Sequence, residues 1–148
     1  MLSQKCQYAL RAVFELAKRL GEGPIKIQEV AKAQAIPSRF LEIILNQLKQ
    51  AGIVASRRGK SGGYLLDKAP EEVSVGDVIR LVQGPICVVD CRSGAQDGQC
   101  PLDGDCVFWP LWEEARKALL QVYDCTTFAD LIRNQRERHQ AQAATYSI

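Results

Sequence analysis

The spacing of the apolar residues changes after the third predicted helix, and this change constrains the fold more than any other feature of the chain. Before it, apolar residues recur every three to four positions over 8–20, 27–33 and 38–51, which predicts three short amphipathic helices. After it, 53–56 and 64–66 predict two short strands. Three helices followed by a hairpin is the order of a winged helix-turn-helix, so we expect a mainly helical fold with a small β-hairpin wing.

Residues 27–48 meet the steric demands of a helix-turn-helix. Ala31 is small where the two helices approach, and Ile36 is apolar directly after the turn. Ala35 occupies the turn position that usually holds glycine, and a left-handed backbone there costs about 1 kcal/mol. The apolar residues expected on the buried side of the third helix are Phe40, Leu41, Ile44, Leu45 and Leu48.

The first turns of the third helix carry the residues that a helix-turn-helix presents to the major groove. We expect Ser38, Arg39 and Glu42 to face the base edges. Arg39 suits a guanine or a phosphate, and the Glu42 carboxylate can accept a hydrogen bond from the N4 amino group of cytosine. Three packed helices can also be a module that binds no DNA. The choice between these two interpretations therefore depends on the segment that follows the helices.

The loop between the two predicted strands is cationic and rich in glycine. It places three cations within four residues, and its glycines allow the backbone to approach a sugar-phosphate chain or the minor groove. A basic hairpin loop can also be a solvated turn, but its position directly after the third helix favours DNA binding. The predicted DNA-contacting residues of the wing are Arg57, Arg58, Lys60, Ser61, Gly62, Gly63 and Tyr64.

The net charge of +2 conceals an uneven distribution along the 148 residues. Residues 1–80 hold 13 basic and 8 acidic side chains, whereas residues 81–148 hold 6 and 9. The first part therefore carries +5 and the second −3, so only the first part suits a polyanion. We accordingly expect double-stranded DNA as the partner of the first part.

Four segments with different roles are expected along the chain. Residues 1–83 form the DNA-binding domain. Residues 84–106 have neither a helical nor a strand period and hold four of the six cysteines, which is typical of a functional segment. Residues 107–140 are expected to form dimerisation helices, and 141–148 a flexible tail.

The helix expected over 107–123 carries more aromatic surface than so small a domain readily buries alone. Pairing of this helix about a two-fold axis would set two recognition helices one DNA turn apart, about 34 Å. An ordinary core helix is the alternative. The aromatic residues of the helix expected over 107–123 are Phe108, Trp109, Trp112 and Tyr123.

A further helix is expected after a capping box formed by Thr127 and Asp130.

The cysteines favour metal or redox chemistry over a disulfide scaffold in a reducing compartment. Cys91, Cys100 and Cys106 lie in a glycine-containing loop that can fold around an inorganic core. Thiolates are ligands for both iron-sulfur clusters and zinc, and redox-active thiols or purely structural cysteines are further alternatives. Cys125 is expected to be a buried small hydrophobe, and His139 a surface residue.

Three stretches of the chain, 7–12, 37–85 and 126–131, resemble the Rrf2 family of bacterial winged-helix regulators. The Arg-Gly-x-x-Gly-Gly-Tyr pattern of the wing, from Arg58 to Tyr64, is the most distinctive part. The resemblance covers the chain from about Leu2 to Asn134. It implies a homodimeric transcription factor that binds a palindromic operator, with the long C-terminal helix crossing to the partner.

Sensing members of that family hold an iron-sulfur cluster with a similar cysteine triplet, which Cys91, Cys100 and Cys106 match by position. The chain departs from two family subgroups. Trp109 stands where one has a histidine ligand, and Gln7 where another takes an aspartate from the partner. The fourth ligand is therefore open. Its candidates are Cys87, Cys6 from the partner chain, an oxygen ligand and an exogenous thiol.

The sequence thus predicts a cytoplasmic, homodimeric transcriptional repressor whose cysteine loop senses cluster, redox or small-molecule status. Neither a membrane-spanning stretch nor a signal-peptide core is found in the sequence. The alternative within the same fold is a regulator controlled by a protein partner or a metabolite of cysteine metabolism, without a cluster. A zinc-binding module or an enzyme has little support, because the single histidine is not accompanied by a nucleophile-base pair or a phosphate loop.

Overall fold

The computed structural model describes residues 1–89, 101–102 and 104–147. Six α-helices, one short 3-10 helix and one antiparallel hairpin make up this part of the chain, which confirms the predicted fold class. In chain order they are α1 (Gln4–Lys18), α2 (Ile27–Gln34), α3 (Ser38–Gln50), β1 (Val54–Arg57), β2 (Gly63–Leu66), η1 (Pro70–Glu72), α4 (Val75–Gln83), α5 (Trp109–Cys125) and α6 (Phe128–Tyr146).

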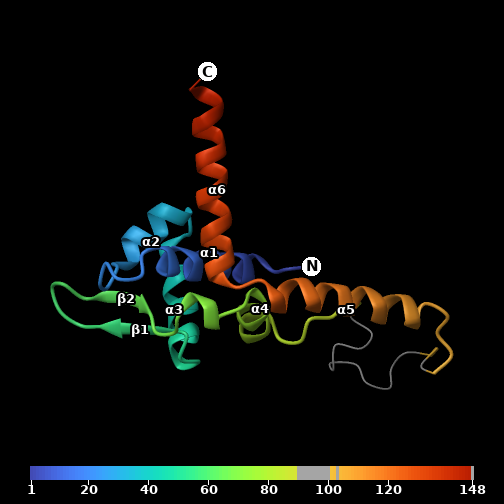
Figure 1. The fold of residues 1–148 in the computed structure, drawn as a ribbon. Helices are drawn as coiled ribbons and strands as arrows, with labels where there is room; N and C mark the ends of the chain where they lie inside the picture. The colour runs from blue at the N-terminus through green and yellow to red at the C-terminus, as the bar shows by residue number, and fades with distance from the viewer. Residues whose placement is uncertain (90–100, 103, 148) are drawn as a thin grey trace.

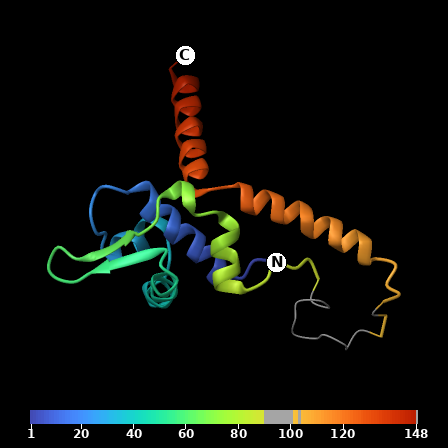
Figure 2. The same cartoon turned by 60° about the horizontal axis from the view of Figure 1, so that its bottom comes forward.

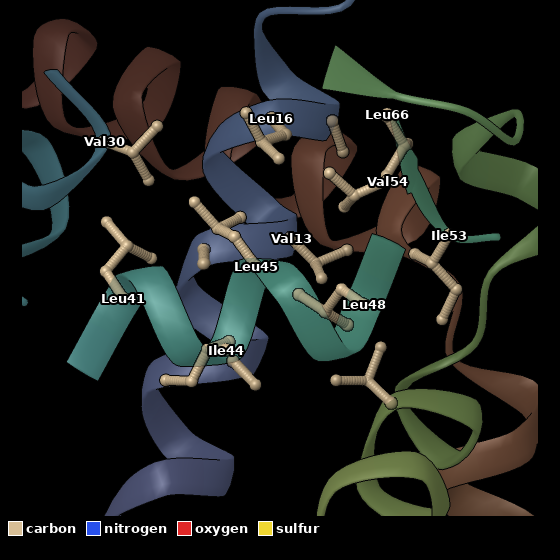
Figure 3. Close-up of a cluster of buried hydrophobic side chains, with 14 of the residues drawn as sticks. Val13, Leu16, Val30, Leu41, Ile44, Leu45, Leu48, Ile53, Val54 and Leu66 are labelled. Carbon is tan, nitrogen blue, oxygen red and sulfur yellow. The ribbon is translucent and has the colours of Figure 1, made fainter. Parts of the chain in front are cut away.

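The core lies between α1, α3 and the base of the hairpin, as Figure 3 shows. Val13 of α1 and Leu45 and Leu48 of α3 are fully buried, as their three-to-four-residue spacing predicts. Val54 and Leu66, directly paired across the hairpin, close the end of this core. The helices α1 to α3 and the hairpin therefore share one apolar core, to which Phe128 and Ile132 of α6 also contribute.

Figures 1 and 2 show that the two C-terminal helices project from this body in different directions, with α5 leading away from the hairpin and α6 carrying the C-terminus. Helix α6 begins at the predicted capping box, in which Thr127 Oγ1 accepts from the Asp130 N–H at 3.2 Å. Among the helices in the described part of the chain, none combines the length and apolar character needed to cross a bilayer.

Two expectations from the sequence are wrong. Phe40, expected in the core, is 40% exposed, because it lies beside the buried stripe of α3 and its ring rests against Tyr8 of α1. Cys125, expected to be buried, is exposed at the end of α5. Helix α6 extends as far as Tyr146, because alanine and glutamine are good helix formers. The flexibility expected of 141–148 stays a prediction.

Candidate nucleic-acid interface

The turn between α2 and α3 has the left-handed residue that a helix-turn-helix requires. Ala35 has φ 50° and ψ 51°, and the following Ile36 N–H donates to the Ala31 carbonyl at 2.9 Å. The Arg11 guanidinium of α1 donates to the carbonyl oxygens of Gln34 and Ala35. These bonds satisfy carbonyls at the end of α2 and help to hold the turn in a conformation that alanine adopts at a cost of about 1 kcal/mol.

A buried carboxylate fixes α2 to α1. Glu15 is only 3% exposed, yet its Oε2 accepts from Gln34 Nε2 at 2.7 Å and lies 3.3 Å from Lys18 Nζ. A buried charge is tolerated only when it is paired and hydrogen-bonded, and both conditions hold here. The two helices that support α3 are thus tied together by polar contacts as well as by packing.

The outward face of α3 carries the three predicted base-reading residues. Ser38, Arg39 and Glu42 are all exposed. Ile43 and Asn46 are exposed on the same face, at four and seven positions from Arg39, and the sequence analysis missed both. The helical period that identifies the buried side chains of α3 would have found them, had it been applied to the opposite face.

Aromatic and cationic side chains connect the start of α3 to α1. The Arg39 guanidinium carbon lies 5.0 Å from the Phe40 ring centroid, and the Phe40 ring lies 6.2 Å from that of Tyr8. Arg11 in turn lies 5.4 Å from the Tyr8 ring. Such cation-ring contacts restrict the side chain of Arg39 before any ligand arrives, which reduces the entropy lost when it binds.

The wing presents its cations to solvent. Arg57, Arg58 and Lys60 are exposed, and within the described residues none of them forms a salt bridge. The loop from Arg57 to Gly63 contains no acidic residue. Unneutralised cations on a projecting hairpin are what a phosphate backbone attracts.

The glycines and the tyrosine of the wing have a structural role in the free protein. A Cβ atom on Gly62 would lie 2.2 Å from the Arg57 carbonyl oxygen, and one on Gly63 would lie 2.4 Å from that of Ile25. Tyr64 and Ile25 exchange two backbone hydrogen bonds of 2.8 Å. These predicted DNA-contacting residues therefore also shape the hairpin and anchor it to the chain that enters α2.

A compact joint links the DNA-binding unit to α5. The ion pair between Arg80 and Asp124 measures 2.7 Å, and Asp124 fits beside Gly76, where a Cβ would lie 1.9 Å from its Oδ1. The Val75 N–H donates to the Thr126 carbonyl at 2.9 Å. Close approach at a glycine, an ion pair and a backbone bond therefore all fasten the C-terminal end of α5 to α4.

The structure describes three of the five cysteines proposed as cluster ligands, Cys6, Cys87 and Cys106. Cys91 and Cys100 lie outside the described residues. Cys106 is half-buried one turn before α5, and its carbonyl accepts from the Trp109 N–H at 3.1 Å. Cys87 is also half-buried and lines a cavity of about 590 Å³ between α4 and α5. Within the described part of the chain, no three Cys, His, Asp or Glu side chains gather as a metal site would require.

Cys6, a candidate fourth ligand, is fully buried inside its own subunit. Burial raises the pKa of its thiol above the ordinary value, which disfavours the thiolate that a metal needs. His139 lies exposed on the polar part of α6, as expected. Of the two candidate cysteines for the fourth position, only Cys87 is accessible in the described structure.

Comparison with known proteins agrees with this arrangement. A rrf2-like HTH-type transcriptional regulator of Rhodobacter capsulatus is 39% identical over 138 residues, which cover 89% of this chain and 92% of the relative. The structure of CymR (YrzC), the global cysteine regulator of B. subtilis, superposes with a TM-score of 0.74 at 34% identity, over 90% of this chain and 97% of that one. The structure of T. potens IscR superposes with a TM-score of 0.76 at 31% identity, over 93% and 90%.

The family model described as an iron-dependent transcriptional regulator matches residues 2–134. This span contains the helix-turn-helix, the wing, the joint and α5. The relatives are transcriptional regulators, which confirms the prediction of a DNA-binding regulator rather than an enzyme. The chain therefore belongs to the Rrf2 family of helix-turn-helix transcriptional regulators.

Proposed function

We propose that two copies of this chain form a repressor that binds a palindromic operator through α3 and the wing. The observation that carries the proposal is the wing, whose loop holds three exposed cations and directly follows the helix-turn-helix in the chain. Phosphate contacts from Arg57, Arg58 and Lys60 position the protein. Contacts from Ser38, Arg39 and Glu42 to base edges supply the sequence preference.

Helix α5 supports the dimer. It has no fully buried residue in the single chain, and exposed apolar side chains run along it and the residues before it. Burying such a surface against a second copy removes it from water, and a two-fold axis makes each α5 the partner of the other. The large exposed members are Val107, Phe108, Leu111, Leu119 and Val122.

Selection of bound fragments from random DNA by the full-length protein tests the proposal. The expected product is an inverted repeat with half-sites about one helical turn apart, bound by a dimer in analytical ultracentrifugation. Leu111→Glu should weaken dimerisation and operator binding together, because it places a charge on the proposed interface. Glu114→Gln, at an exposed polar position of the same helix, is the matched control. Selected DNA without an inverted repeat, or binding by a monomer, would contradict the proposal.

We further propose that the cysteine segment holds an iron-sulfur cluster through Cys91, Cys100 and Cys106, with Cys87 as the cysteine candidate for the fourth ligand. The donor chemistry fits, because Cys87 and Cys106 are half-buried thiols at the two ends of the segment 87–106. When bound, a cluster supplies one-electron redox chemistry and sensitivity to oxidants. Its state would act on operator affinity through the N-terminal end of α5, which follows Cys106 directly.

An anaerobic absorption spectrum with iron, sulfide and zinc analysis tests this second proposal. Visible absorption with matching iron and sulfide supports a cluster, whereas zinc alone points to a structural site. Operator affinity should then differ between the loaded protein and its Cys91→Ala, Cys100→Ala, Cys106→Ala variant. Equal affinities would remove the sensing role.

A regulator without a cluster is the second candidate, and the similarity to CymR favours it. The CymR structure matches this chain about as well as the IscR structure does, by TM-score and by identity. In that case a protein partner or a metabolite of cysteine metabolism would control operator binding. Colourless, metal-free protein whose operator affinity changes with such an effector would support this candidate.

A further inference from the structure

One exposed apolar side chain interrupts the polar outer face of α3. Ile43 is 60% exposed, whereas Leu41, Ile44, Leu45 and Leu48 of the same helix are at most 1% exposed. The side chain therefore contributes little to the core. An exposed isoleucine is unremarkable on an ordinary surface, but here it lies on the face that a helix-turn-helix inserts into DNA.

The neighbours of Ile43 place it at the centre of that face. Arg39 lies four residues before it and Asn46 three residues after it, which puts all three on one side of the helix. Phe40, the other exposed apolar residue of α3, rests against Tyr8 of α1 and under the Arg39 guanidinium. Apart from Phe40, whose ring is engaged by Tyr8 and Arg39, the exposed neighbours of Ile43 on α3 are therefore polar.

The major groove contains one apolar group that matches such a side chain, the C5-methyl of thymine. We propose that Ile43 reads this methyl group and is a specificity-determining residue of the protein. The inference rests on the proposed binding of α3 in the major groove and extends it to one base. Side chains three or four residues apart on a helix are about 5–6 Å apart, so the thymine lies within about two base pairs of the base contacted by Arg39 or Asn46.

Deoxyuridine provides the test, because it lacks only the methyl group of thymine. Operator DNA is first selected with the full-length protein, and each thymine of one half-site is then replaced singly by deoxyuridine. At one position the wild-type affinity should fall about fourfold, the effect of one buried methyl group. Ile43→Ala should bind the thymine operator more weakly and show no further loss with deoxyuridine at that position. Asn46→Ala, a change on the same face, is the matched control and should retain the fourfold loss.

Each other outcome has a distinct meaning. An unchanged fourfold loss in Ile43→Ala would overturn the proposal, because another residue would then read the methyl group. Specific binding by the wild type that is insensitive to every deoxyuridine would overturn it as well. Absence of any selected sequence would instead overturn the proposed function, and this inference with it. The thermal unfolding midpoint of Ile43→Ala should equal that of the wild type, since the side chain is exposed.

Discussion

The DNA-binding unit and the two C-terminal helices bury very different amounts of apolar surface. Among the described residues, every buried hydrophobic side chain except Phe128 and Ile132 lies between Cys6 and Ile79. Helix α5, although 17 residues long, buries none completely. The first region, together with the start of α6, therefore contains the apolar contacts that fold a single chain, whereas α5 leaves large apolar side chains exposed.

This contrast separates two kinds of stability. A side chain in the first region contributes to the free energy of unfolding of one subunit. In the proposed dimer, an apolar side chain of α5 contributes mainly to association, so its effect depends on protein concentration. The following experiments test that division, beginning with the largest expected effect.

The same substitution in the two regions gives the clearest contrast. Leu45→Ala should lower the free energy of unfolding by about 2–5 kcal/mol, because it leaves a cavity in a fully buried site. Leu111 is 54% exposed, so Leu111→Ala should change the stability of the isolated subunit by less than about 0.5 kcal/mol and raise the dimer dissociation constant. Urea unfolding at several protein concentrations measures both. Equal losses for the two variants would contradict the division.

The wing should affect DNA binding without affecting the fold. Replacing Arg57, Arg58 and Lys60 together by alanine should weaken operator binding by about 100-fold at moderate salt. The slope of the logarithm of affinity against the logarithm of salt concentration should also fall, by the equivalent of up to about three phosphate contacts. The three side chains are exposed, so the urea midpoint should remain that of the wild type. Titrations at several salt concentrations decide the matter. A loss restricted to one DNA sequence, with the salt dependence unchanged, would mean that these residues read bases instead.

The capping box of α6 should contribute about 1 kcal/mol, measured as the loss in Thr127→Ala. Hydrogen bonds from the Thr127 N–H and hydroxyl, together with Arg133, lower the pKa of Asp130 below its ordinary value of 3.8. Because the pKa of this carboxyl is lower in the folded state than in the unfolded state, its ionisation stabilises the folded state at pH values above the ordinary pKa. That stabilisation is lost as the pH falls through the lowered value.

Asp130→Asn should therefore reduce stability at neutral pH and lose less on acidification below about pH 4 than the wild type does. Thermal unfolding between pH 7 and pH 2 measures the difference. Asp77 of α4 is the matched site in the DNA-binding unit. Burial alone would raise the pKa of its carboxyl, but hydrogen bonds from Ser74 and Arg80 outweigh this effect and lower the pKa. Identical acid profiles for wild type and Asp130→Asn would contradict the assignment.

The smallest expected effect lies at the joint between the two regions. Arg80 and Asp124 are each about 40% exposed, so their coupling energy in a double-mutant cycle should be below about 1 kcal/mol. The cycle uses Arg80→Ala, Asp124→Ala and the double variant in urea unfolding. A coupling of several kcal/mol would show that the joint contributes to subunit folding and not only to the placement of α5.

Patterns with a local cause are predictable from this sequence. The left-handed residue at Ala35 and the cap at Thr127 depend on neighbours a few positions away, and both occur. The buried side of α3 follows from its helical spacing, apart from Phe40. That ring sits at the edge of the stripe, where Tyr8 of another helix decides its position.

Patterns that depend on other subunits or distant segments are less predictable. The exposure of Cys125 follows from the placement of α5, which has no local sequence signal. The predicted DNA contacts and cluster ligands remain predictions, because they concern partners whose positions the chain alone does not determine. Gly63 illustrates the difficulty, since the same residue is needed for close backbone contact with Ile25 whether or not it meets DNA.

The contacts at the C-terminal end of α5 define a joint about which the helix can turn. Its C-terminal end is held to α4 by Arg80, Asp124 and the close approach at Gly76, while its other end continues from Cys106. At 1.5 Å per residue its 17 residues span about 25 Å, so a shift of about 2 Å at Trp109 is a rotation of about 5° at the joint. A displacement of Trp109 would thus reach the DNA-binding unit as a change of angle.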